Sequence, residues 1–228
     1  MEKTHAVLEA KVSQADAPGL YDKLSEHYGA WAALTESKAR KRALRLAAIR
    51  DGQQVLEVAV GTGLAFLEVT RSNPNGRNAG IDISKGMLAK AEKRLRDAGC
   101  TVFELSIGSA FDINEADSSF DVVLNSYMFD LIDEQEWPRI LREFHRVLKP
   151  GGRLVMVNMT VGEKFGSGIY RRIYQRSPRL MGGCRGVRLS GALAEGGFAV
   201  KSRRYVQQLL FPSEVILATK GDPAPVSA

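Results

Sequence analysis

The residues best suited to bind a small molecule lie in a glycine turn and at an acidic position about 20 residues beyond it. Gly61 and Gly63 follow the apolar run 54–60 and precede apolar residues at helical spacing, which predicts a buried parallel strand, a tight turn and a helix start. Backbone N–H groups at such a helix start can face a ligand, and glycine lets it approach because no Cβ intervenes. Asp82 ends the next predicted strand, where doubly wound folds hold the two hydroxyls of a ribose.

Two segments further along the chain extend this pattern. Residues 120–125 predict another strand, and residues 148–157 predict a Pro-Gly-Gly turn followed by a strand. Together with the glycine turn and Asp82, they resemble the class I S-adenosylmethionine (SAM) dependent methyltransferases, and especially the small enzymes similar to the ubiquinone/menaquinone-biosynthesis methyltransferases. The resemblance covers residues 50–160 well and the rest of the chain loosely.

The resemblance implies an α/β fold with SAM as cofactor and S-adenosylhomocysteine as product. The expected sheet is Rossmann-like, doubly wound and seven-stranded, mostly parallel with an antiparallel last strand, and it carries helices on both faces. We expect the SAM-binding methyltransferase domain over residues 51–220, with an N-terminal helical lid at 1–50 and a substrate-cap insertion at about 160–190.

The resemblance also assigns residues to the cofactor. Glu57 is polar within an apolar strand; relatives hold an acid there that orients the methionine amine, and a satisfied structural carboxylate is the alternative. Ala59 replaces a frequent first glycine, and Ser109 stands where an aspartate accepts from the adenine amino group. The implied cofactor-binding residues are Tyr21, Tyr28, Glu57, Ala59, Gly61, Gly63, Asp82, Ile83, Met87, Ser109, Ala110, Asn125 and Ser126; of these, Ile83 and Met87 could equally belong to the core.

The N-terminal residues predict an amphipathic helix. Four large side chains recur at spacings of three and four, on one helix face: Tyr21, Leu24, Tyr28 and Trp31. That face packs on the domain, forms a lid over the cofactor, or does both; in the resembling family a tyrosine of this segment reaches the methionine carboxylate. Residues 37–50 predict a second helix with alanine and leucine inward and all lysine and arginine outward.

The segment after the 120–125 strand opens at the carboxyl edge of the sheet, where α/β proteins bind ligands. It borders the sulfonium in the resembling family, so the candidate catalytic residues are Asp130, Tyr127 and Tyr170. Asp130 is either a general base or a helix cap. Tyr170 lies in a predicted helix, 169–176, which is either a solvated cap or part of a pocket for an anionic or aromatic group.

The remaining periodic segments supply the layers around this edge. Pro138 indicates that the helix predicted over 133–148 either starts its regular part near Trp137 or bends there, because proline is tolerated in a first helical turn and kinks a helix interior. The other expected elements are a helix at 85–97 and strands at 100–105, 198–206 and 214–219.

Composition narrows the class of protein. The net charge of +6 is concentrated at 38–50 and 171–188, which are either solvated helix faces or a surface for an anionic membrane. No basic motif interleaved with aromatic residues points to nucleic acid. No apolar run reaches the roughly 18 residues of a membrane span, and no signal-peptide core is present, so we expect a cytoplasmic protein, with peripheral membrane contact left open. Cys100 and Cys184 form no metal-ligand pattern, so we expect no metal.

The sequence therefore predicts a SAM-dependent methyltransferase whose methyl acceptor is a small, lipophilic or aromatic molecule. The alternatives are a phospholipid amine N-methyltransferase at a membrane surface and a SAM-binding protein that transfers no methyl group. A nicotinamide dehydrogenase is disfavoured because Phe66 occupies the third glycine position of the dinucleotide-binding motif. The acceptor atom and the oligomeric state stay open.

Overall fold

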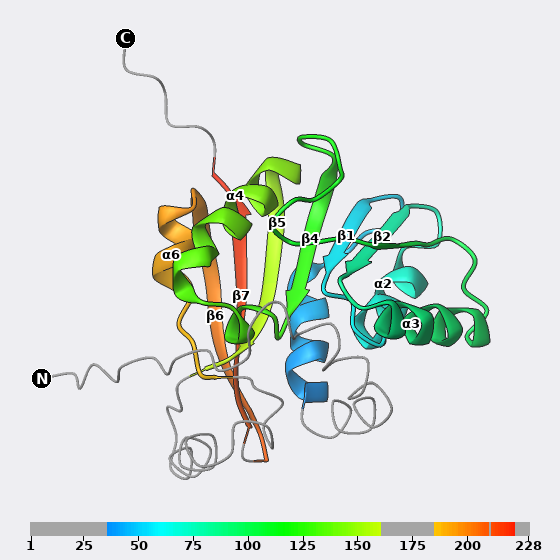
Figure 1. Ribbon diagram of the computed structural model, residues 1–228, viewed down its shortest axis with the longest axis horizontal. Helices are drawn as coiled ribbons and strands as arrows, with labels where there is room; N and C mark the ends of the chain where they lie inside the picture. Colours follow the sequence, from blue (N-terminus) through cyan, green and yellow to red (C-terminus); the bar gives the residue numbers. More distant parts are fainter. Residues whose placement is uncertain (1–35, 161–184, 210, 222–228) are drawn as a thin grey trace, which may run out of the picture.

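The computed structural model describes residues 36–160, 185–209 and 211–221. Its centre is one sheet of seven strands, with helices packed against it (Figure 1). The strands are β1 (Gln54–Val58), β2 (Arg77–Asp82), β3 (Glu104–Ile107), β4 (Phe120–Ser126), β5 (Leu148–Met159), β6 (Phe198–Gln208) and β7 (Phe211–Lys220). The helices are α2 (Leu64–Ser72), α3 (Lys85–Asp97), α4 (Trp137–Val147) and α6 (Ser190–Glu195), with short 3₁₀ turns η1 (Phe129–Leu131) and η2 (Glu134–Glu136). Residues 36–47 are also helical.

The strand order is β3-β2-β1-β4-β5-β7-β6. Strands β1 to β5 pair in parallel, whereas β7 runs antiparallel to both β5 and β6. This confirms the expected mostly parallel, seven-stranded sheet with an antiparallel last strand. The strand order reverses between β1 and β4: β2 and β3 follow β1 toward one edge of the sheet, whereas β4 and β5 lie on the other side of β1. Ligands of open α/β sheets bind at such a switch point, beside the carboxyl ends of the strands.

The two faces of the sheet bury different sets of apolar residues. On one face, Leu56, Met156 and Ile216 pack with the apolar stripe of α4 and with α6. On the other face, Val55, Val122 and Val155 pack with Val69 of α2 and with the alanines of the helix at 36–47. Because side chains alternate along a strand, Glu57 shares its face with Val55 and therefore points toward the helix at 36–47.

Several element boundaries differ from the sequence-based expectation: the helix expected at 37–50 spans 36–47, and the strands expected at 198–206 and 214–219 are β6, Phe198–Gln208, and β7, Phe211–Lys220. The strand expected at 100–105 is β3, Glu104–Ile107, which pairs with residues 79–82 of β2. The helix expected over 133–148 opens with η2, and regular helix begins at Trp137 with a proline in its first turn, which is the first of the two alternatives for Pro138. Residues 1–35 of the predicted lid, 1–50, and residues 161–184, which hold most of the predicted cap, lie outside the described residues.

None of the helices in the described ranges is both long enough and apolar enough to cross a membrane.

Gly63 is required by helix packing as well as by the turn. It precedes α2 with a φ of 77°, and a Cβ added there would lie 2.9 Å from the Ala91 Cβ and 3.0 Å from the Ala91 Cα on α3. At Gly61, by contrast, an added Cβ would meet nothing within 4 Å. The two glycines therefore serve different purposes: Gly63 lets α2 and α3 approach, and Gly61 keeps the turn open.

Replacing Gly63 by alanine should destabilise the ligand-free protein by about 1–3 kcal/mol through overpacking, on top of about 1–2 kcal/mol for the left-handed backbone. Gly61→Ala is the matched control and should cost the backbone contribution alone. Urea unfolding of both variants measures this difference. Adding Ala91→Gly to Gly63→Ala should recover part of the loss; equal destabilisation by the two glycine variants would contradict the packing role.

Candidate functional site

The turn after β1 has an unusual backbone at three positions. Ala59, Gly61 and Gly63 have φ values of 61°, 56° and 77°, all in the left-handed region. Glycine adopts this region without strain, but alanine does so at a cost of roughly 1–2 kcal/mol. Ala59 lines the cavity described below, and so does Tyr127, which has a φ of 53°. Two strained non-glycine residues thus border one cavity, and backbone strain of this kind tends to gather at functional sites.

Asp82 ties this turn to the end of the neighbouring strand. Its Oδ2 accepts a hydrogen bond from the Gly61 N–H at 2.8 Å, and its Oδ1 accepts from the Ser84 N–H at 2.9 Å. The side chain is largely buried, and the carboxylate is fixed in orientation by these bonds. Each carboxylate oxygen can accept a further bond, so Asp82 suits a pair of adjacent hydroxyls such as those of a ribose.

Glu57 is a buried carboxylic acid facing a small cavity. The residue is 2% exposed, and its Oε2 has no hydrogen-bond partner among the described residues. Burial raises the pKa of Glu57 to about 8, with Arg40 opposing this rise and Asp82 adding to it. A buried acid with an unused oxygen is costly unless a ligand satisfies it, and an ammonium group would do so.

The cavity beside Glu57 has a volume of about 70 Å³ and opens to solvent. Cofactor pockets usually measure about 300–1,000 Å³, so these residues enclose one end of a ligand rather than all of it. The lining residues are Glu36, Arg40, Glu57, Ala59, Val60, Gly61, Thr62, Leu64, Ala65, Ser126 and Tyr127. A carboxylic acid and a guanidinium in the same cavity match the two charges of an amino-acid group.

Arg40 is the residue that the sequence did not single out. The helix at 36–47 was expected to direct every lysine and arginine outward, yet Arg40 lines the cavity and is only partly exposed. Its helix neighbours Lys41 and Arg42 are exposed, as predicted. The available signal was the spacing: on the helix, Arg40 borders the buried stripe formed by Ala39, Ala43 and Ala47.

Beyond Asp82, the carboxyl edge of the sheet carries an exposed apolar surface. Ile83 follows β2 and Ile107 ends β3, and the two large side chains are 45% and 56% exposed although Asp82 and Ile107 are paired across the strands. Such a shelf suits a flat ring like adenine. Met87 is buried in the described fold, and its N–H donates to the Ser84 hydroxyl at the start of α3.

Ser109 and Ala110 lie next to this shelf. The Ser109 hydroxyl accepts from the Phe111 N–H at 3.2 Å, and Ala110 is buried in the core. The hydroxyl retains a donor proton and a second lone pair, so its local bond leaves it able to contact a ligand.

The carboxyl end of β4 supplies the remaining predicted residues. Asn125 is fully buried, and its amide donates to the Val58 carbonyl at 2.9 Å, which joins β4 to the end of β1. Ser126 and Tyr127 line the cavity, and the Tyr127 hydroxyl shares a 3.0 Å hydrogen bond with Ser213 on β7. Asp130 is also fully buried in η1, and its Oδ2 accepts from the Met159 N–H at 3.1 Å.

The structure brings most predicted residues to one edge and leaves others undescribed. Glu57, Ala59, Gly61, Ser126 and Tyr127 line one cavity, and Asp82 and Ile83 continue the edge beyond Gly61. The predicted residues Tyr21, Tyr28 and Tyr170 lie outside the described residues.

Comparisons with known proteins find methyltransferases similar to this chain. A family described as a methyltransferase domain matches residues 55–152. A demethylmenaquinone methyltransferase of Bacillus velezensis is 29% identical over 163 residues, which cover 68% of this chain and 67% of that protein. A demethylmenaquinone methyltransferase of Symbiobacterium thermophilum is 33% identical over 142 residues, covering 60% of this chain and 56% of that protein.

Solved structures share the fold. A SAM-dependent methyltransferase of Methanosarcina mazei superposes with a TM-score of 0.64 at 22% identity, over 77% of this chain and 95% of that chain. At this level of identity the similarity concerns the fold alone.

The raised pKa of Glu57 makes the free energy of unfolding depend on pH, with a defined sign. Its pKa in the unfolded chain is about 4.3. Between that pH and about 8 the unfolded chain has released the proton while the folded protein keeps it, so stability falls as pH rises, by up to about 1.4 kcal/mol per pH unit. Below and above this window Glu57 contributes no slope.

We expect Glu57→Gln to reduce this loss of stability between pH 5 and 8 in the ligand-free protein. Urea unfolding at intervals of one pH unit measures it, and the difference between wild type and variant isolates Glu57 from other titrating groups, including Glu214, whose pKa burial also raises. Parallel pH profiles for the two proteins would show that Glu57 is not a buried neutral acid.

Proposed function

We propose that this chain, which belongs to the class I SAM-dependent methyltransferases and is related to the menaquinone methyltransferases, transfers the SAM methyl group to a small lipophilic or aromatic acceptor. The observation that carries the proposal is the order of groups along the carboxyl edge: Arg40 and Glu57 in the cavity, Asp82 beyond the glycine turn, and the exposed Ile83 and Ile107 shelf. This order matches an amino acid, a ribose and an adenine joined in that sequence.

Each of these groups fits one part of SAM. The Arg40 guanidinium suits the methionine carboxylate because the two are opposite in charge, and the Glu57 carboxyl suits the methionine amine because a bound ammonium group would favour its ionised form. Asp82 suits the ribose hydroxyls, and the space in front of Gly61 leaves room for the ligand. Bound SAM supplies an electrophilic methyl group on a sulfonium sulfur.

The contribution of the chain is then mainly to position the reactants. A well-oriented pair of reactants gains an effective molarity of about 10⁵ M or more, so a rigid edge can supply much of the rate. We retain Tyr127, Asp130 and Tyr170 as candidate catalytic residues. Tyr127 is supported by its place in the cavity, where the Ser213 bond and the Val157 carbonyl, which accepts from its N–H at 2.7 Å, hold it. Asp130 is supported as a positioning group by its bond to the Met159 N–H.

A quinone-like or other aromatic acceptor is favoured by the relatives named demethylmenaquinone methyltransferases. Phe129, which follows β4, is packed in the core against Trp137 and Phe144 at ring-centroid distances of 6.0 Å. Met128, half-buried at the end of β4, is the better-placed apolar side chain.

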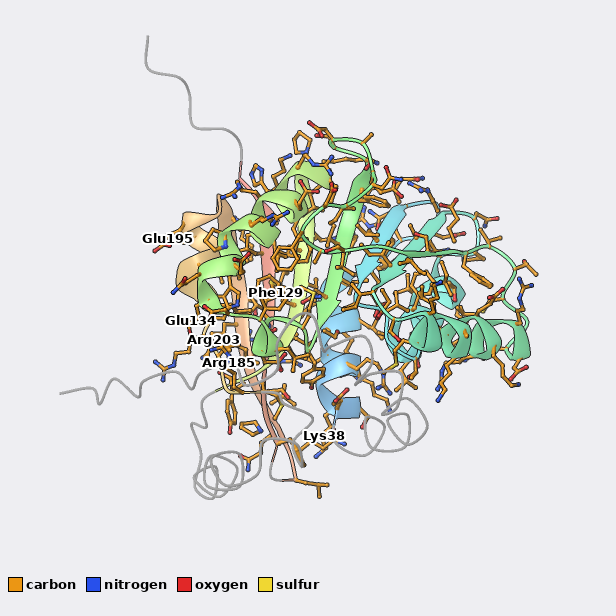
Figure 2. The ribbon with its side chains drawn as sticks, viewed as in Figure 1. Lys38, Phe129, Glu134, Arg185, Glu195 and Arg203 are labelled. Atoms are coloured by element: carbon orange, nitrogen blue, oxygen red, sulfur yellow. The ribbon has the colours of Figure 1, made fainter. Side chains whose placement is uncertain are left out.

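A second candidate function is supported by the outer surface of the helix at 36–47. Lys38, labelled in Figure 2, is exposed together with Lys41, Arg42 and Arg45 on the same helix. A basic residue near an anionic bilayer adds roughly 1 kcal/mol of attraction, so these side chains could hold the protein at a membrane that carries a lipid acceptor.

Transfer is tested with methyl-labelled SAM and a panel of phenols, hydroquinones, amines and thiols, together with vesicles containing phosphatidylethanolamine. We expect label to appear on an aromatic hydroxyl compound or its ring. Label on the vesicle lipid alone would favour the membrane-surface enzyme. Binding of S-adenosylhomocysteine without label on any acceptor would favour a SAM-binding protein without transfer.

The assignment of Arg40 and Asp82 to different parts of SAM is tested with two ligands, S-adenosylhomocysteine and 5′-methylthioadenosine. The second ligand lacks the amino-acid carboxylate and amine. Arg40→Ala should weaken S-adenosylhomocysteine about 10–100-fold, the loss of one charged hydrogen bond, and leave 5′-methylthioadenosine unchanged. Asp82→Ala should weaken both ligands, because both carry the ribose.

Isothermal calorimetry measures these affinities, with Arg42→Ala as the matched control from the exposed side of the same helix. Equal weakening of both ligands by Arg40→Ala, or normal affinities in Asp82→Ala, would remove the assignment of these residues to SAM.

A further inference from the structure

Two fully buried polar side chains on neighbouring strands of the sheet carry atoms without a hydrogen-bond partner. Neither the amide nitrogen nor the amide oxygen of Asn158 has a hydrogen-bond partner among the described residues, and the Oε1 of Glu214 has none there either. Both residues are 0% exposed. They stand directly opposite each other, since Asn158 on β5 pairs with Glu214 on β7. Three unused polar atoms therefore come together at one point in the interior.

This point lies next to the cofactor cavity. Ser126 lines the cavity and pairs with Val157, so Asn158 is one residue further along the adjacent strand. Neighbouring strands are about 4.8 Å apart and each residue rises about 3.3 Å, which puts the Cα atoms of Asn158 and Ser126 roughly 6 Å apart. By strand alternation Ser126 and Ser213 point to the face of the cavity, whereas Asn158 and Glu214 point to the opposite face, so the two places are neighbours only along the strand ends.

The surroundings hold Glu214 in place without satisfying all of it. Its Oε2 accepts from the Arg203 Nε at 2.6 Å and from the Thr160 hydroxyl at 3.4 Å, and the backbone of Leu189 also lies beside the carboxyl group, whereas Oε1 has no partner in hydrogen-bond geometry among the described residues. Burial raises the pKa of Glu214 against the influence of Arg203. Figure 2 shows Arg203 and Arg185 near the end of the sheet at which β4 finishes. The carboxyl group is thus fixed at the carboxyl edge.

A buried asparagine with a purely structural role looks different in the same protein. Asn78 on β2 is also buried, but its amide nitrogen donates to the Asn73 and Val102 carbonyls and its oxygen accepts from the Asn73 amide. Unused buried polar atoms are unfavourable in the free protein, and sites that bind a polar ligand group contain such atoms. The unused amide of Asn158 therefore resembles a ligand-binding group rather than a structural one.

We propose that Asn158 and Glu214 form a polar subsite that binds an aromatic hydroxyl group of the methyl acceptor. A hydroxyl both donates and accepts: its oxygen would accept from the Asn158 amide nitrogen, and its proton would go to the Glu214 Oε1 or the Asn158 Oδ1. The inference rests on the proposed methyltransferase function and names the acceptor class at that site. Both residues are specificity-determining and positioning residues, since they bind the acceptor beside the reacting atoms.

The test compares two probes, 1-naphthol and naphthalene, which differ only in the hydroxyl group. Their affinities for the full chain are measured by fluorescence titration, with and without saturating S-adenosylhomocysteine. We expect the wild type to bind 1-naphthol at least about tenfold more tightly than naphthalene, a preference that Asn158→Leu and Glu214→Gln should largely abolish. The glutamine variant replaces the Glu214 acceptor by an amide and keeps the side-chain shape, so it covers the case in which the leucine variant fails to fold.

Thermal unfolding separates this role from a structural one. Asn158→Leu removes unused polar atoms and should leave the Tm of the ligand-free protein unchanged or higher, whereas the matched control Asn78→Leu should lower it and keep the 1-naphthol preference. A Tm loss in Asn158→Leu as large as that in Asn78→Leu would overturn the proposal. So would a preference for 1-naphthol that survives in both subsite variants, or its absence in the wild type.

The subsite and the proposed function fail in distinguishable ways. S-adenosylhomocysteine affinity, measured by calorimetry on the same variants, should stay at the wild-type value, because neither side chain lines the cofactor cavity among the residues described there. Normal S-adenosylhomocysteine binding without a 1-naphthol preference would refute the subsite alone. Absent S-adenosylhomocysteine binding in the wild type would refute the proposed function.

Discussion

The hydrogen bond from the Gly61 N–H to Asp82 is the contact on which the arrangement of the edge depends. It joins the turn after β1 to the end of β2, and the Asn125 amide makes the equivalent link from β4 to the Val58 carbonyl. The ends of three parallel strands are thereby held in fixed relation at the switch point of the sheet. A ligand that spans these ends meets a surface whose polar groups are already oriented, which lowers the entropy lost on binding.

The buried acid and the strained residues of this surface lower the stability of the ligand-free protein. Glu57 is buried with an unused oxygen, and Ala59 and Tyr127 are held in the left-handed region that non-glycine residues rarely adopt. Each feature is unfavourable by itself and all three border the same cavity. The rest of the fold, with apolar cores on both faces of the sheet, supplies the stability that allows the site to keep them.

Much of the fold and part of the site were predictable because they depend on local patterns. Apolar periodicity predicted the individual strands and helices, the Gly-x-Gly turn and Asp82 marked the switch point, and the seven-stranded sheet with its antiparallel last strand followed from the family resemblance. Arg40 was missed because its inward position depends on where the helix lies over the sheet, which helical spacing alone does not define. Asn158 and Glu214 were missed for a related reason: they are 56 residues apart and meet only through the antiparallel pairing of β5 with β7.

Strand alternation also explains how one edge can serve two molecules. Glu57 points to the face covered by the helix at 36–47, where Val55 and Val155 are buried, whereas Asn158 shares its face with Met156 and the α4 core. The cavity and the polar subsite therefore lie on opposite faces of the sheet and approach each other only at the carboxyl ends of β4 and β5. In-line transfer needs donor and acceptor on opposite sides of the moving methyl group, and an edge reached from both faces provides that geometry.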